Sequence, residues 1–269
     1  MYNTHYNFKK KPFELTPDPE FIWLSEEDIE TISRFKLAVR KNAGILVVTG
    51  DVGTGKTTFA NYLKKILENQ IISAIIPYPD LDDFSFFKYL SDELGINKEF
   101  NSKGAFLFYL DQFLHEISTR NTSAMIIIDD AQNMSTQLIK EIRLLSNLKI
   151  NGKRMIKILL VAQSENDENF IEKIEEDIEQ AVSFRHHIKP LTKSEMQKYI
   201  SYRLKKAGAA KNLMGSDVID EIYSYSTGFP RLINIICDNA LLAGYSEGIH
   251  EIKKTTIIKC IRELRQSGV

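Results

Sequence analysis

The sequence contains few of the residues that build metal or redox centres. It has two cysteines, Cys237 and Cys260, far apart in helical patterns and without the close spacing of metal-ligand pairs. Of its five histidines only His186 and His187 are adjacent, and neighbouring residues of a strand point to opposite faces. We therefore expect two reduced thiols in the core and no histidine-based metal enzyme. No Ser-His-Asp or Cys-His arrangement is recognisable either.

Long apolar runs are also absent. No stretch approaches the roughly 18–20 apolar residues of a membrane span, and the N-terminal segment lacks the apolar run of a signal peptide. Charges nearly cancel, with 35 Lys and Arg against 36 Asp and Glu, which argues against broad electrostatic capture of nucleic acid. We expect a cytoplasmic protein that reaches the inner face of a membrane only through a partner.

Strand and helix patterns alternate through the first 190 residues. Short β-rich runs predict strands at 44–50, 72–78, 124–129, 155–163 and 184–191. Helical spacing predicts helices at 26–40, 56–68, 83–95, 103–118 and 135–148. In the first helix the apolar stripe consists of Ile29, Ile32, Phe35 and Val39. This alternation is typical of an α/β fold, a parallel sheet covered by helices on both faces.

After Pro190 the pattern becomes entirely helical. Helices are predicted at 193–208, 216–228, 229–245 and 255–266. We therefore predict two domains, an α/β domain at 1–190 and a small all-α lid domain at 191–269. There is no internal repeat and no low-complexity segment.

The strongest motif is "GDVGTGKTT" at 50–58, which has the G-x-x-x-x-G-K-[ST] spacing of a phosphate-binding loop between a strand and a helix. Its glycines let backbone N–H groups curl around phosphate oxygens, Lys56 supplies a positive charge, and the Thr57 hydroxyl can ligate Mg²⁺. The predicted nucleotide-binding residues are Gly50, Asp51, Val52, Gly53, Thr54, Gly55, Lys56, Thr57 and Thr58. The predicted cofactors are ATP and Mg²⁺.

A second constellation follows the strand at 124–129. Asp129 is placed to hold the metal through water, as acidic residues at strand ends do beside phosphate loops. Asp130 is the candidate catalytic base for the attacking water, at a position where a glutamate is expected. Its arm is one methylene shorter, and a misplacement of about 1 Å can lower a rate on the order of 100-fold.

Several stretches together resemble one family. They include "KKKPFELTPDPEFIWLS" (9–25), "GDVGTGKTT" (50–58), "IIDDAQNMS" (127–135), "IKPLTKSEMQKYISYRLKKAG" (188–208) and "TGFPRLINIICDNALLAGY" (227–245). They resemble the AAA+ ATPases of the general secretion pathway protein A (ExeA-like) group, which includes ATPases of pilus-biogenesis and exosortase-associated exopolysaccharide loci. The opening "PF-x-L-T-P-D-P" is more specific to the group than the phosphate loop. Transposition ATPases are more distant relatives.

The resemblance implies a P-loop NTPase fold with a nucleotide site between sheet domain and lid, in subunits that associate into rings or arcs. It places Gln163 as the residue that senses the γ-phosphate and Arg231 of "GFPR" as the lid arginine that reaches the phosphates. A strand-end amide and a solvated charge are the plainer interpretations of these two residues. "PFELTPDP" would pack near the adenine, or Pro12, Phe13 and Pro17 would only attach the N-terminus to the core.

Two departures from the family pattern matter. The family usually has Glu at the position of Asp130, and Gln-Arg before the last strand where this chain has Gln180-Ala181. That arginine acts on a neighbour's γ-phosphate, and losing such a finger lowers turnover by about 10³–10⁵-fold. Arg185 is a candidate substitute or only a surface charge. The two departures predict slow hydrolysis and a nucleotide-gated switch.

Three functions remain open. The first is an ATPase in the assembly or export of a cell-envelope complex, which would need a membrane-complex protein as partner. The second is a DNA-associated ATPase of a transposition system, for which "KKILENQ", "NGKRMIK" and "RLKKAG" are the only modest basic candidates. The third is a nucleotide-gated scaffold with little hydrolysis. Envelope function ranks first, and nucleic acid is not favoured.

Overall fold

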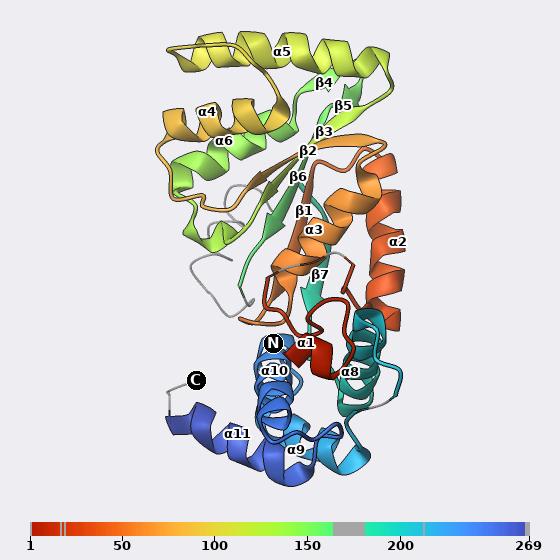
Figure 1. Ribbon diagram of the computed structural model, residues 1–269. Helices are drawn as coiled ribbons and strands as arrows, with labels where there is room; N and C mark the ends of the chain where they lie inside the picture. Colours follow the sequence, from red (N-terminus) through yellow and green to blue (C-terminus); the bar gives the residue numbers. More distant parts are fainter. Residues whose placement is uncertain (1, 17, 19, 164–180, 212, 267–269) are drawn as a thin grey trace. The chain divides into compact units, whose positions relative to one another are not determined.

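A computed structural model of the protein describes residues 2–16, 18, 20–163, 181–211 and 213–266 (Figure 1). The chain forms two compact units. The sheet unit comprises Glu26–Val52 and Phe59–Ile188, and the helical unit comprises Met1–Ser25, Gly53–Thr58 and Lys189–Val269. The helical unit thus takes in the N-terminal segment and part of the phosphate loop. The predicted boundary between an α/β domain at 1–190 and a lid domain at 191–269 stays a prediction.

The sheet unit contains a five-stranded parallel sheet in the order β2-β3-β6-β1-β7. Its strands are β1 (Ile45–Gly50), β2 (Ile71–Ile76), β3 (Ser123–Ile128), β6 (Ile156–Val161) and β7 (Val182–Ile188). All six residues of β1 and of β6 are buried, as expected for strands of a parallel sheet with both faces covered. The predicted α/β class is confirmed.

Helices cover both faces of this sheet (Figure 1). They are α2 (Glu26–Arg40), α3 (Lys56–Leu67), α4 (Asp83–Leu94), α5 (Lys103–Thr119) and α6 (Thr136–Ser146). Ile45 and Val47 of β1 belong to the hydrophobic cluster that α4, α5 and α6 complete. Because side chains alternate along a strand, Leu46 and Val48 face the other layer, where Phe35 of α2 meets Phe184 of β7.

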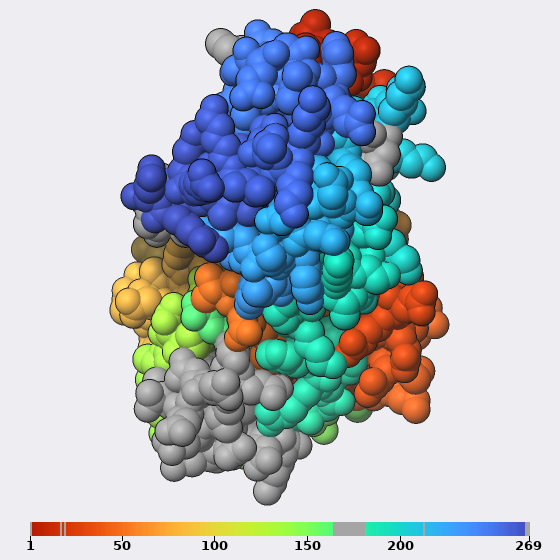
Figure 2. All heavy atoms as spheres, turned by 90° about the horizontal axis from the view of Figure 1, so that it is seen from below, coloured from red at the N-terminus to blue at the C-terminus, as the bar shows by residue number. Residues whose placement is uncertain are grey.

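The helical unit contains α1 (Tyr2–His5), α8 (Lys193–Ala207), α9 (Ser216–Ser226), α10 (Pro230–Ser246) and α11 (Lys254–Gln266). A capping box formed by Thr192 and Glu195 starts α8, and Gly208 ends it with φ 106°. The core of this unit joins apolar residues of these helices to five aromatic side chains of the N-terminal segment, Tyr2, Tyr6, Phe8, Phe13 and Phe21. In Figure 2 the red N-terminal atoms lie beside the blue atoms of the C-terminal helices.

Most predicted elements lie within a few residues of their observed bounds. Four short elements of the described residues were not predicted: α1, η1 (Ala131–Asn133), and the hairpin strands β4 (Lys149–Ile150) and β5 (Lys153–Arg154). The apolar stripe of α2 is wrong in one residue. Ile29 is 56% exposed, whereas Ile32 and Phe35 are buried together with Thr31, because Ile29 lies at the edge of the face that meets the sheet.

The cysteines match the expectation, since Cys237 and Cys260 are buried free thiols. Burial raises the pKa of both, so they stay protonated. Among the helices of the described residues, none has the length and apolarity needed to cross a bilayer.

One buried charge in the sheet gives a stability prediction. Lys157 on β6 is 6% exposed, and burial lowers its pKa to about 8, although its Nζ donates to the Arg154 carbonyl at 2.7 Å. Between pH 8 and 10.5 the unfolded chain binds a proton that the folded chain does not, so the free energy of unfolding rises with pH in that window. Below pH 8 the full penalty of burying the charge remains.

We therefore expect Lys157→Met to raise the free energy of unfolding at pH 7 by about 1 kcal/mol or more, and to remove this pH dependence. Urea unfolding at pH 7 and at pH 10 measures both effects. Lys149→Met, an exposed site on β4, is the control. Equal unfolding midpoints of wild type and Lys157→Met at pH 7 would contradict the expectation.

Candidate functional site

The phosphate loop follows β1, which lies between β6 and β7 in the sheet. Gly53 and Gly55 have φ angles of 87° and 100°, in the left-handed region that other residues rarely adopt. A Cβ at Gly55 would meet no heavy atom within 4 Å, so backbone conformation rather than space favours glycine there. The motif thus has a curled backbone at these two glycines, of the kind that cradles phosphate oxygens in other phosphate loops.

The second half of the loop belongs to the helical unit, where it contacts α10. The Arg231 N–H donates to the Gly53 carbonyl at 3.2 Å, and a Cβ at Gly53 would lie 3.1 Å from the Arg231 Cβ. Thr54 and Lys56 are 5% and 9% exposed, and α3 begins at Lys56. The structure therefore brings Arg231, predicted from "GFPR", to the loop that was predicted to hold phosphate.

The start of α10 depends on a close backbone approach. Gly228 has φ 87°, and a Cβ there would lie 1.9 Å from the Leu191 carbonyl oxygen. The Leu191 N–H also donates to the Gly228 carbonyl at 2.9 Å. Pro230 then occupies the first position of the helix, where a missing N–H does no harm. "GFPR" is thus a helix start that only glycine permits.

In the sheet unit, side chains gather at the carboxyl ends of β3 and β6, which are neighbours. The Asp130 N–H donates to Asp129 Oδ1 at 3.1 Å, and Asp130 has φ 48°, which puts it in the left-handed region. Gln132 Nε2 donates to Asp130 Oδ1 at 3.1 Å, while Gln132 Oε1 accepts from the Gln163 N–H at 3.1 Å. One amide therefore joins the predicted base to the predicted sensor residue.

The edge strand β7 carries Arg185 and the two histidines. Arg185 is exposed and pairs in register with Val47, whereas Ile188 pairs with Gly50, so Arg185 lies in the middle of the strand rather than at its carboxyl end. His187 Nδ1 lies 3.0 Å from Thr49 Oγ1, and His186 Nδ1 lies 3.3 Å from Thr31 Oγ1 of α2. Gln180, next to the expected finger position, lies outside the described residues.

The helical unit contains an open pocket of about 350 Å³. The N-terminal loop, defined as residues 10–16, forms one wall and α10 forms the other. The lining residues are Lys11, Phe13, Glu14, Leu15, Thr16, Ile235, Asp238 and Asn239. Pro12 and Phe13 are buried in the same unit, so they also attach the N-terminal segment to its core. Pro17 lies outside the described residues.

Many protein families share such phosphate loops, and comparison with known proteins distinguishes between them. A family model described as "AAA domain" matches residues 39–170. Over 254 residues the chain is 28% identical to general secretion pathway protein A of Aeromonas hydrophila, covering 94% of this chain and 46% of that protein. Together these matches support an AAA+ ATPase similar to general secretion pathway protein A. It spans about half the length of this curated relative.

Solved structures share the AAA+ fold at low identity. The ADP form of the Aeropyrum pernix ORC2 protein has a TM-score of 0.73 and 17% identity, over 95% of this chain and 73% of that chain. Drosophila ORC bound to DNA has a TM-score of 0.71 and 12% identity, over 98% of this chain and 65% of that one. At these identities the similarity establishes the fold alone.

Two residues of this AAA+ chain were missed by sequence reasoning. Gln132 follows the acidic pair in "DDAQN", and only the left-handed turn at Asp130 brings its amide back to Asp130. Asp238 lines the pocket and accepts a hydrogen bond from the Tyr2 hydroxyl, although the two residues lie 236 positions apart. The Gln132 signal was present in the quoted motif, whereas the Asp238 contact has no local signal.

The glycine before α10 gives a matched prediction. We expect Gly228→Ala to lower the free energy of unfolding by about 3 kcal/mol or more, because backbone must move away from the new Cβ. Gly248→Ala is the control, since its φ is 72° but a Cβ there meets nothing within 4 Å. It should lose only about 1 kcal/mol, from the left-handed conformation. Equal losses in urea unfolding would show that the Leu191 contact does not matter.

Proposed function

We propose that this protein binds ATP with Mg²⁺ and hydrolyses it slowly. The observation that carries the proposal is the tie between the phosphate loop and α10: two left-handed glycines curve the loop, and its Gly53 carbonyl holds the helix that bears Arg231. Amides at the start of α3, the Lys56 charge and the Arg231 guanidinium suit a polyphosphate. In the proposal Lys56 and Arg231 bind the phosphates.

The pocket beside the N-terminal loop suits the nucleoside end of the same ligand. Arg231, Ile235 and Asn239 follow at intervals of four residues along one face of α10. From Arg231 to Asn239 the distance along the helix axis is about 12 Å, at 1.5 Å per residue. That length compares with an extended nucleoside triphosphate. The pocket volume of about 350 Å³ lies within the range of ligand pockets. Its walls carry the Phe13 ring and several polar groups.

The donor set also fits a hard divalent cation. The Thr57 hydroxyl and the Asp129 carboxylate offer the oxygen ligands that Mg²⁺ prefers, with water completing its shell. When bound, the ion would neutralise charge on the phosphate oxygens. In the proposal Thr57 contacts the ion directly and Asp129 holds it through water.

Asp130 is proposed as the base that accepts a proton from the attacking water, and Gln163 as the γ-phosphate contact. The hydrogen bond from Gln132 holds the Asp130 carboxylate in place, and a short side chain so held has little reach. General bases act within about 2.6–3.2 Å of the proton they take, so reach decides the rate. This supports slow hydrolysis, with Arg185 of a neighbouring subunit as the candidate finger.

The biological setting is proposed from the relative. General secretion pathway protein A is a secretion protein by its name, and this chain covers 46% of it. We propose that this ATPase assembles into a ring or arc in the cytoplasm and serves assembly or export of a cell-envelope complex. It would reach the inner face of the membrane by binding a protein of that complex. A nucleotide-gated scaffold is the limiting case in which hydrolysis contributes little.

Steady-state phosphate release from ATP with Mg²⁺ tests the slow-hydrolysis proposal. We expect the wild type to lie close to the Lys56→Ala blank, and Asp130→Glu to be faster by about tenfold or more, because the longer arm brings the base nearer to water. ATP affinity should stay equal between wild type and Asp130→Glu. A wild-type rate well above the blank, with no gain in Asp130→Glu, would mean that Asp130 is an adequate base.

A DNA-associated ATPase is the second candidate, and one juxtaposition bears on it. The Lys9 N–H donates to the Ala207 carbonyl at 2.8 Å, so the Lys9 backbone lies beside the end of α8, where Lys205 and Lys206 precede Ala207. Duplex DNA retention with ATP present, measured from 50 to 200 mM salt, decides the question. Binding that falls steeply with salt favours the DNA candidate, and absence of binding at 50 mM rejects it.

A further inference from the structure

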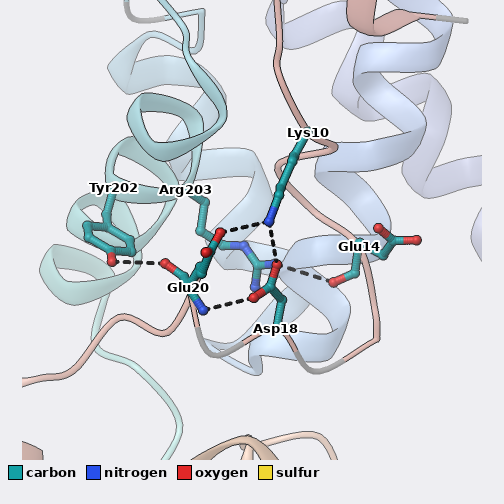
Figure 3. Close-up of polar contacts among 6 residues, drawn as sticks. All are labelled: Lys10, Glu14, Asp18, Glu20, Tyr202 and Arg203. Atoms are coloured by element: carbon teal, nitrogen blue, oxygen red, sulfur yellow. Dashed lines mark hydrogen bonds and ion pairs between the residues drawn. The ribbon is translucent and has the colours of Figure 1, made fainter. Parts of the chain in front are cut away.

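Besides the buried Phe13 side chain, the N-terminal loop is held against the helices by one buried cation. Arg203 on α8 is 8% exposed. Its Nε donates to the Pro12 carbonyl at 2.6 Å and its Nη2 to the Glu14 carbonyl at 3.3 Å. The rings of Phe21 and Tyr199 lie 5.5 and 5.4 Å from the guanidinium carbon. Figure 3 shows Arg203 between α8 and the loop, reaching the Glu14 carbonyl.

The ion pairs of this loop are exposed and therefore weaker. Lys10 Nζ lies 2.7 Å from Glu20 Oε2 and 3.5 Å from Asp18 Oδ2, but Lys10 and Glu20 are more than half exposed. Exposed ion pairs contribute about 0–1 kcal/mol, whereas hydrogen bonds to a charged group contribute about 1.5–3 kcal/mol. Among the polar contacts, those of Arg203 thus do most to fix residues 12–14, alongside the buried Phe13 side chain.

The same guanidinium is connected to α10. Its Nη1 donates to the Tyr199 hydroxyl at 2.6 Å, and that hydroxyl donates to Asn234 Oδ1 at 2.7 Å. Tyr199 and Asn234 are 6% and 7% exposed, so water competes little for these bonds. Burial raises the pKa of Tyr199, which keeps its hydroxyl protonated and able to donate.

The two ends of this hydrogen-bond chain meet opposite walls of the pocket. Pro12 and Glu14 belong to the wall formed by the N-terminal loop. Asn234 belongs to α10, next to Ile235 in the other wall and one turn after Arg231. A change at Arg203 would therefore alter the distance between the walls without touching the phosphate loop.

We propose that Arg203 is a positioning residue for the nucleoside end of the nucleotide, because it sets the spacing between the N-terminal loop and α10. The inference rests on the proposed nucleotide site. The proposal predicts a selective effect on binding: the loss of Arg203 weakens binding of a whole nucleotide but not of a bare polyphosphate. A residue needed only for overall folding would weaken both.

The test measures dissociation constants of ATP and of inorganic tripolyphosphate, each with Mg²⁺, by titration calorimetry on the full chain. We expect Arg203→Lys to weaken ATP by about ten- to a hundredfold, because lysine keeps the charge but cannot donate to two carbonyls and a hydroxyl at once. Tripolyphosphate should bind as in the wild type. Lys198→Met, at an exposed site on the same helix, is the control and should change neither ligand.

Tyr199→Phe keeps the test valid if Arg203→Lys fails to fold. It removes only the hydroxyl that joins Arg203 to Asn234, and should weaken ATP by about three- to tenfold with tripolyphosphate unchanged. Wild-type ATP affinity in the folded Arg203→Lys and Tyr199→Phe variants, or equal weakening of both ligands, overturns the inference. Failure of the wild type to bind ATP or tripolyphosphate would instead reject the proposed nucleotide site itself.

Discussion

The hydrogen bond from the Arg231 N–H to the Gly53 carbonyl connects the two motifs on which the site depends. The first amides of a helix have no partner within the helix, and Pro230 at the first position has no N–H to offer. Arg231 supplies the next amide, and a carbonyl turned outward by a left-handed glycine receives it. The tight Cβ spacing at Gly53 explains why a glycine is needed there as well as in the curve of the loop.

That bond lies at the start of α10, and α10 connects the other parts of the proposed site. α10 carries Arg231 at its start and pocket residues two turns later, while its buried face holds Asn234 in the chain that leads to Arg203. A single helix therefore relates the proposed phosphate contact to the pocket. For the pocket to form, the sequence must therefore specify the spacing between the N-terminal loop and α10, and no single contact surface is enough.

The fold and the phosphate loop could be predicted because both depend on local patterns. Apolar runs such as "ILVVTG" and "SAMIII" are buried on both faces, and the motif at 50–58 states its own spacing. Gln132 and Arg203 could not be placed, because their partners depend on a left-handed turn and on contacts across 191 positions. Ile29 was misplaced because helical periodicity gives the buried face only to within one neighbouring residue.

The composition of the helical unit also bears on how the chain folds. Its core combines Tyr2, Tyr6 and Phe13 with helices that follow Lys193, and hydrogen bonds across it join residues 191, 235 and 236 positions apart. Contacts of such sequence separation form late, since the intervening chain must first be confined. During synthesis the aromatic N-terminal segment therefore lacks its native partners until the last third of the chain has left the ribosome. The sheet unit lies between the two in sequence, so its folding shortens the loop that the helical unit must close.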